Sequence, residues 1–165
     1  MGVLICKKIS LGGWVHYLSD KEIERIHKNE SVDNNGKWMY FFNNIKVAQD
    51  ISEKLADLNI VDYFKYTDMD KTRQTSGVMC MYCDKDDINT HRKIIEFMLE
   101  NNMIEKLDSG KYKNLSFKLN TQTLNKECGD KFIGQIKLSE FIDMQTGKWI
   151  FTDNIFWREA RKTNY

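Results

Sequence analysis

The sequence predicts an α+β fold in which a curved, mostly antiparallel sheet carries two main helices packed on one face. Short runs of apolar, β-branched and aromatic residues recur along the chain and indicate strands. Two longer segments repeat their apolar residues at helical spacing. No linker, repeat or low-complexity tract divides the 165 residues. We therefore expect a single domain over 1–165, because 41% hydrophobic residues at this length can form one core.

The first part of the chain begins with an expected edge strand at 3–9 and a short helix at 20–28. Ser19 is a suitable N-cap for that helix, and Glu22 completes a capping box. The polar run SVDNNG predicts a loop. The run KWMYFF that follows at 37–42 consists of strong strand formers and predicts a central strand.

Two amphipathic helices account for most of the remaining helical signal. Apolar residues at helical spacing predict the first at 46–59. Asp87 is a suitable N-cap for the second, which extends through Met103. The other expected strands are 60–67, 78–83, 115–119, 132–138 and 148–151, and a last short helix is expected at 154–162. With both helices on one face, the other face of the sheet is expected to stay open for a ligand.

Charge and hydropathy narrow the classes of function. The 25 basic and 24 acidic residues give a net charge of +1, so no global field favours nucleic acid, and any anion site must be local. No apolar stretch approaches the roughly 20 residues that span a bilayer, and the N-terminus lacks the order of a secretory signal. We expect a cytoplasmic protein without a membrane partner. The absence of proline and the abundance of Asn, Lys and Ile are typical of AT-rich genomes, as in some bacteria and phages.

The four cysteines are expected to be reduced thiols. Cys80 and Cys83 form a C-x-x-C motif, but residues three apart on a strand point to opposite faces, which predicts core thiols over a metal or redox pair. The histidines His16, His27 and His91 have no metal-ligand spacing and are expected to be structural or exposed. We expect no metal and no cofactor.

Strand alternation predicts a group of lysines on the open face. Lys37, Lys65 and Lys118 converge there if their strands lie side by side in the sheet. Such cations with aromatic walls bind phosphate through charge-assisted hydrogen bonds. The alternative is that these lysines only solubilise a strand edge. The candidate site comprises Lys37, Met39, Tyr63, Lys65, Arg73, Tyr82 and Lys118.

The order of these motifs resembles the phosphothreonine lyase family, bacterial effectors that remove phosphate from phosphothreonine by β-elimination. The resemblance covers a core of about 37–120. The motifs that carry it are GKWM at 36–39, the helix at 46–59, DYFKYTDM at 62–69, the strand that ends near Tyr82, and Ser-Phe-Lys at 116–118. The expected architecture is also similar to that of cap-binding translation factors.

The resemblance implies a role for each matched residue. Lys65 stands where the family has its general base, and Tyr82 borders the site. Lys37, Lys118 and, more loosely, Arg73 are implied to bind phosphate.

Met39 occupies the place of the family's general acid histidine, and a thioether cannot donate a proton. Losing a general acid costs about two to four orders of magnitude in rate. The leading hypothesis is therefore a protein that binds a phosphorylated peptide, nucleotide or other anion. One alternative is a phage-type inhibitor that acts on a host defence enzyme through its surface. Another is an active carbon–oxygen lyase whose acid is relocated to His16, His27 or His91.

Overall fold

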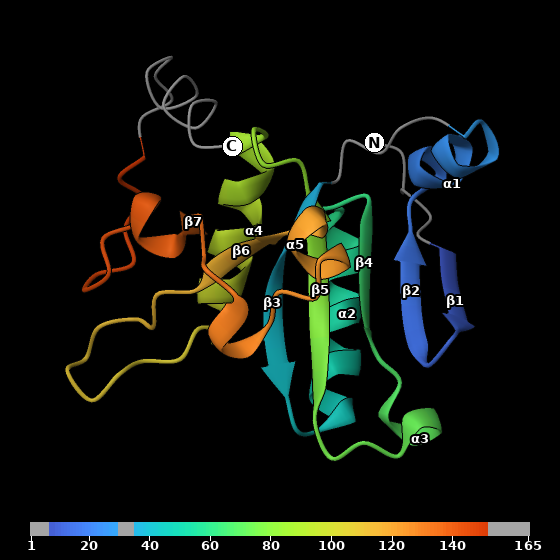
Figure 1. The fold of residues 1–165 in the computed structure, drawn as a ribbon, viewed down its shortest axis with the longest axis horizontal. Helices are drawn as coiled ribbons and strands as arrows, with labels where there is room; N and C mark the ends of the chain where they lie inside the picture. The colour runs from blue at the N-terminus through green and yellow to red at the C-terminus, as the bar shows by residue number, and fades with distance from the viewer. Residues whose placement is uncertain (1–6, 30–34, 152–165) are drawn as a thin grey trace.

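The computed structural model describes residues 7–29 and 35–151, and it confirms the α+β fold with an open, curved antiparallel sheet (Figure 1). The strand order is β1-β2-β4-β5-β3-β6-β7. The strands are β1 Lys7–Leu11, β2 Trp14–Leu18, β3 Gly36–Phe42, β4 Tyr63–Thr67, β5 Gly77–Cys83, β6 Ser116–Leu119 and β7 Ile136–Lys137. The helices are α1 Asp20–His27, α2 Ile45–Leu58, α3 Met69–Thr72, α4 Ile88–Glu100 and α5 Asn120–Leu124. In the described part of the chain, no helix is both long and apolar enough to cross a bilayer.

Side-chain caps begin the helices near the places that the sequence predicts. The Ser19 side chain accepts a hydrogen bond from the Glu22 backbone N–H at 3.2 Å. Asp87 accepts one from the Thr90 N–H at 3.1 Å, which starts α4. Asn44 does the same for α2. These bonds satisfy N–H groups that the first turn of a helix leaves without partners.

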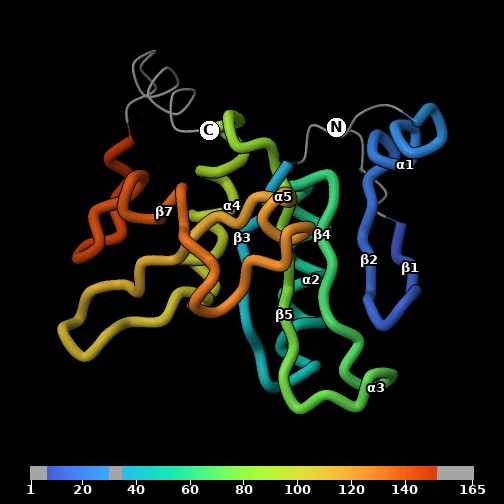
Figure 2. The backbone as a smooth tube through the Cα atoms, viewed as in Figure 1, coloured from blue at the N-terminus to red at the C-terminus, as the bar shows by residue number. Residues whose placement is uncertain are grey.

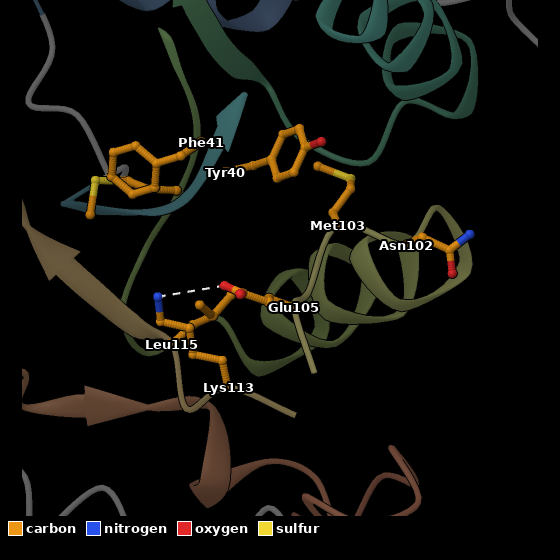
Figure 3. Close-up of a pocket in the computed structure, with 8 residues that line it drawn as sticks. Tyr40, Phe41, Asn102, Met103, Glu105, Lys113 and Leu115 are labelled. Atoms are coloured by element: carbon orange, nitrogen blue, oxygen red, sulfur yellow. Dashed lines mark ion pairs between the residues drawn. The ribbon is translucent and has the colours of Figure 1, made fainter. Parts of the chain in front are cut away.

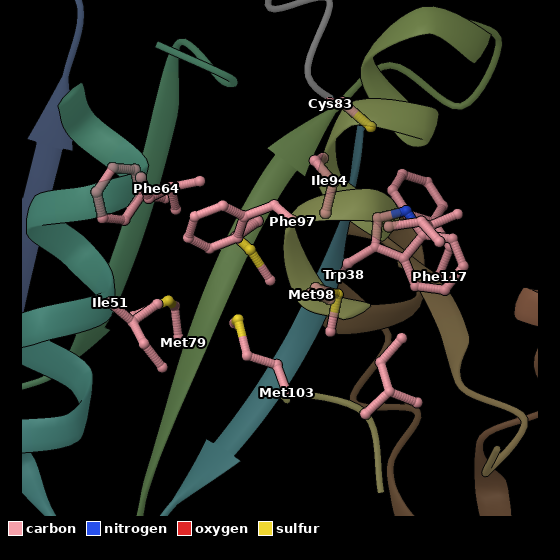
Figure 4. Close-up of a cluster of buried hydrophobic side chains, with 14 of the residues drawn as sticks. Trp38, Ile51, Phe64, Met79, Cys83, Ile94, Phe97, Met98, Met103 and Phe117 are labelled. Carbon is pink, nitrogen blue, oxygen red and sulfur yellow. The ribbon is translucent and has the colours of Figure 1, made fainter. Parts of the chain in front are cut away.

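The hydrophobic core lies between one face of the sheet and the helices α2 and α4, as expected. Trp38 of β3 and Phe64 of β4 are almost completely buried on this face. They pack in one cluster with Ile51 of α2 and Phe97 of α4 (Figure 4). His91 of α4 is buried in the same region, where its Nδ1 accepts a hydrogen bond from Trp38 Nε1 at 3.0 Å. This histidine is structural.

The opposite face of the sheet, here called the open face, is partly covered, which the sequence did not predict. The connection from α5 to β7 crosses it, while α2 lies behind the sheet (Figures 1 and 2). The buried Gln122 side chain holds this connection in place. Its amide accepts from the Leu119 N–H and donates to the Ile133 carbonyl.

The N-terminal strand prediction needs a correction. The expected strand at 3–9 begins outside the described residues, and the strand in the structure runs from Lys7 to Leu11. It continues through Gly12 and Gly13 into β2, a strand that the sequence did not predict. Both glycines have positive φ, 62° and 79°, as a two-residue hairpin turn of type I′ requires.

The C-terminal strand predictions are largely wrong. Of the expected strand at 132–138 only Ile136–Lys137 pairs. The Phe132 N–H bonds back to the Gly129 carbonyl oxygen and the Ile133 carbonyl oxygen accepts from the Gln122 side chain, so these groups are used outside a strand ladder. The expected strand at 148–151 is reduced to a single bridge between Ile142 and Trp149. Its aromatic residues pack on Phe141 instead of joining the sheet. The helix expected at 154–162 lies outside the described residues.

Candidate functional site

Three lysines from different strands share the open face. Lys37 of β3 lies directly opposite Lys118 of β6 and Tyr82 of β5. Lys65 of β4 lies opposite Cys80, two residues from Tyr82 on the same face of β5. Residues directly opposite in neighbouring strands project to the same side. The charges of Lys65 and Lys118 both act on Lys37, so the three side chains are close enough to interact.

Lys37 is the most enclosed of the three, with only 7% of its surface exposed. Its Nζ donates a hydrogen bond to the Thr123 hydroxyl of α5 at 2.8 Å. It also lies 5.5 Å from the ring centroid of Tyr82. Burial lowers the pKa of Lys37, and although Cys80 acts in the opposite direction, the charges of Lys65 and Lys118 lower this pKa further.

Lys65 of β4 is half-buried. It belongs to a row of residues that lie side by side on neighbouring strands across the sheet. Its Nζ lies 4.0 Å from the ring centroid of Trp14, a cation–π contact. Burial lowers the pKa of this amine as well. Strand register places His16 on one side of Lys65, and Cys80 and then Met39 on the other.

Two stacked tyrosines form a wall beside the lysines. The rings of Tyr63 and Tyr82 lie 4.7 Å apart at an angle of 20°. The Tyr63 hydroxyl is 2.9 Å from His16 Nδ1, and His16 Nε2 is 3.2 Å from the Leu11 carbonyl oxygen. Because a carbonyl can only accept, Nε2 donates to the Leu11 carbonyl oxygen, and in that tautomer Nδ1 accepts from the Tyr63 hydroxyl. Burial is the main cause that raises the pKa of Tyr63 to about 12, so its hydroxyl remains a donor.

Cys80 lies beneath the lysines with 3% of its surface exposed. Burial raises the pKa of its thiol, and the charges of Lys37 and Lys65 only partly offset this effect. Cys83 is buried on the other face, with its Sγ 3.8 Å from His91 Nδ1. The two cysteines of the C-x-x-C motif therefore point to opposite faces, as alternation predicts. The described residues contain no group of three side chains suited to a metal ion.

The lysine group has no counter-charge among the described residues. No carboxylate oxygen there lies within 4.0 Å of the Nζ of Lys37, Lys65 or Lys118. The contacts of these cations are instead aromatic rings and a hydroxyl. Burying a charge without an opposite charge is costly. The site is therefore electrostatically suited to an anion.

Lys118 lies at the edge of the lysine group beside a cavity, and Arg73 lies outside the group. Lys118 Nζ is 5.2 Å from the ring centroid of Phe132, which belongs to the connection that crosses the open face. Met39 lines a cavity of about 510 Å³ together with Lys118 and Phe132. Arg73 is exposed just after α3, and no contact in the described part of the chain joins it to the lysines.

Sequence reasoning missed three residues of the site: Trp14, His16 as a neighbour of Lys65, and Thr123. The first two lie on β2, and the hairpin turn at Gly12 and Gly13 was the signal that could have revealed this strand. Thr123 is placed by the tertiary path of the connection after β6, which no local pattern marks.

Comparisons of this chain with protein-family models, with curated proteins and with solved structures found no match.

Proposed function

We propose that the open face binds a phosphate-bearing ligand between Lys37, Lys65 and Lys118. The observation that carries the proposal is that these partly buried lysines, from three strands, meet without a carboxylate among the described residues. A phosphate supplies the missing negative charge and accepts several hydrogen bonds. The stacked pair of Tyr63 and Tyr82 offers an apolar wall for the group that carries the phosphate.

Binding without elimination is the function that this geometry favours. Lys65 meets one requirement of a base, because burial lowers its pKa and favours the neutral amine. The position that the lyase resemblance assigns to the acid holds Met39, which has no proton to give. His16, the neighbour of Lys65 on β2, is an alternative acid, but its Nε2–H donates to the Leu11 carbonyl oxygen and its Nδ1 accepts from Tyr63. Neither Met39 nor His16 therefore has a free proton to give in the acid step in this arrangement.

Thermal unfolding in the presence of inorganic phosphate, pyrophosphate and a phosphothreonine peptide tests the proposal. A ligand that binds only the folded state raises the unfolding temperature. We expect an increase for the wild type and little or none for Lys65→Ala. The matched control is Lys93→Ala, which removes an exposed lysine of α4 that lies outside the candidate site. A response that survives in Lys65→Ala would place anion binding elsewhere on the chain.

Mass spectrometry of the phosphothreonine peptide after incubation separates binding from catalysis. We expect the peptide mass to stay unchanged. Loss of phosphoric acid, in the wild type but not in Lys65→Ala, would establish an active lyase. Repeating the reaction with His16→Gln would then show whether His16 supplies the proton.

A second candidate function is the binding of a protein partner, as in a phage-type inhibitor of a defence enzyme. Three large apolar side chains favour it, because Phe41 is 70% exposed, Leu124 81% and Ile133 75%. Leu124 and Ile133 both belong to the connection between β6 and β7. If no phosphate compound changes the unfolding temperature, this candidate replaces the first.

A further inference from the structure

The sheet is split between β3 and β6. β3 pairs with β5 along its whole length, from Gly36 to Phe42. It pairs with β6 only at Gly36 and Lys37. Before Lys118, β6 pairs instead with β7 on its other side, through Ser116 and Phe117. Among the described residues, the second half of β3 therefore has a neighbouring strand on one side only.

Backbone hydrogen-bonding groups of β3 point into this split. The N–H and C=O of Val78 both bond to the Thr67 side chain on the β4 side, at 3.0 and 3.4 Å, so they point away from β3. Val78 is the partner of Phe41, and the two residues of such a pair point away from each other. By alternation, Met39 and Phe41 direct their N–H and C=O groups toward the split. No described residue forms a backbone hydrogen bond with them there.

A cavity lies on each face of the sheet at the split. Both cavities are lined by Met39, Phe41, Lys113 and Leu115. The first, of about 360 Å³, is on the helix side, where Tyr40 and Met103 line it together with Glu105 (Figure 3). The second, of about 510 Å³, is on the open face, beside Lys118 and Phe132.

We propose that the split is a binding site for an extended peptide segment, which adds to the free edge of β3. The N–H and C=O groups of Met39 and Phe41 provide its backbone partners. Successive side chains of an extended chain point to opposite faces, which matches one cavity on each side of the sheet. The helix-side cavity takes an apolar residue, against Tyr40 and Met103. The open-face cavity favours an acidic residue next to Lys118.

The occupant is a single chain and not the sheet edge of a second copy. One end of the split is closed by the pairing of Lys37 with Lys118. Its far side is bounded by Lys113 and Leu115, and Leu115 is fixed by the hydrogen bond from the Leu138 N–H to its carbonyl oxygen, at 2.8 Å. A folded sheet edge brings further strands behind it, which this wall excludes. An isolated extended segment has nothing behind it to exclude.

The test uses a pool of capped heptapeptides in which apolar residues alternate with Asp or Glu. Nuclear magnetic resonance of the labelled protein follows the amides of Met39 and Phe41. We expect saturable shifts of these two amides and slower hydrogen exchange. A matched pool, N-methylated at alternate residues, keeps the side chains but removes the backbone donors, and we expect no such effect from it. Equal effects from both pools, or no effect from either at millimolar concentration, would overturn the proposal.

A substitution that removes one backbone N–H of β3 provides a second test. Phe41→Pro removes an N–H that faces the split and leaves the β5 side of the ladder intact. We expect its affinity for the pool to fall about tenfold or more, and Phe41→Ala, which keeps the N–H, to bind more tightly than Phe41→Pro. Lys93→Ala, which removes an exposed lysine of α4 away from the split, is expected to bind the pool like the wild type. A pool with Asn and Gln in place of Asp and Glu keeps the backbone contacts and should still shift both amides, so failure of the anion site can be told apart from failure of this proposal. Self-association measured by sedimentation, with no response to the pool, would assign the split to a second copy and reject the proposal.

Discussion

Lys37 and Lys118 lie directly opposite each other on β3 and β6, with no carboxylate beside either of them in the described part of the chain. Like charges in directly opposed positions destabilise a sheet. The pair is therefore an unfavourable arrangement in the ligand-free protein, and the proposed anion would offset the repulsion between the two amines.

Replacing one lysine of this pair is expected to stabilise the ligand-free protein and to weaken anion binding. Lys118→Met removes the repulsion and keeps the aliphatic length, so we expect the free energy of unfolding in urea to rise by about 0.5 kcal/mol. The stabilisation by pyrophosphate is expected to fall in the same variant. Lys93→Met on α4 is the control and should change neither quantity. A loss of stability in Lys118→Met would show that the lysine pair is not strained.

Anion binding is expected to weaken with rising pH before ordinary lysines would titrate. Burial lowers the pKa of Lys37 and of Lys65 from the usual 10.5, so both amines lose their protons below that pH. Sulfate is a suitable probe because it does not titrate in this range. Calorimetry in buffers of different ionisation enthalpy should detect proton uptake by the protein on binding. Constant affinity from neutral pH up to 10 would contradict a lowered lysine pKa.

The lowered pKa values of Lys37 and Lys65 also affect the stability of the ligand-free protein. This stability is expected to rise with pH, whereas anion affinity falls. Between the lowered pKa of these lysines and 10.5, the unfolded chain binds more protons than the folded one. Their contribution to the free energy of unfolding therefore rises with pH in this window. Urea denaturation of Lys65→Met should show a weaker rise than the wild type.

Tyr63 is expected to contribute stability that disappears in strong alkali. Its hydroxyl bonds to His16, and Tyr63→Phe should cost about 1 kcal/mol at neutral pH. The folded-state pKa of about 12 lies above the ordinary 10.0, so this contribution is complete below pH 10 and is lost as the pH rises through 12. Urea midpoints at several pH values would measure the effect. Tyr40→Phe is the control, because Tyr40 belongs to β3 and lines the helix-side cavity, away from His16.

The cysteines are expected to differ sharply in reactivity. Cys128 is exposed, whereas Cys80 and Cys83 are buried and burial raises the pKa of both thiols. In a Cys6→Ser background, a thiol reagent should modify Cys128 rapidly and the other two only at the rate of unfolding. Adding Cys128→Ser should then abolish the fast phase. Rapid labelling of Cys80 in the folded protein would mean that the floor of the lysine site is open to solvent.

Local patterns were sufficient where a short segment carries its own physical signal. Ser19 and Asp87 begin helices because their side chains bond to backbone N–H groups three residues on, which the sequence alone specifies. Alternation placed Cys80 and Cys83 on opposite faces for an equally local reason. The prediction of a strand at 148–151 was wrong, because an apolar run of this length can pack in an aromatic cluster as well as in a sheet. Its aromatic residues pack on Phe141.

The sequence by itself determined the α+β class, the two long helices and the face of each strand that its lysine occupies, because these depend on spacing within a few residues. Only the tertiary structure decided the neighbours across the sheet: β2 beside β4, α5 over Lys37, and the early departure of β6 from β3. Strand order depends on contacts between residues far apart in the chain, and no local pattern records them. The lysine group and the split in the sheet are both products of that order.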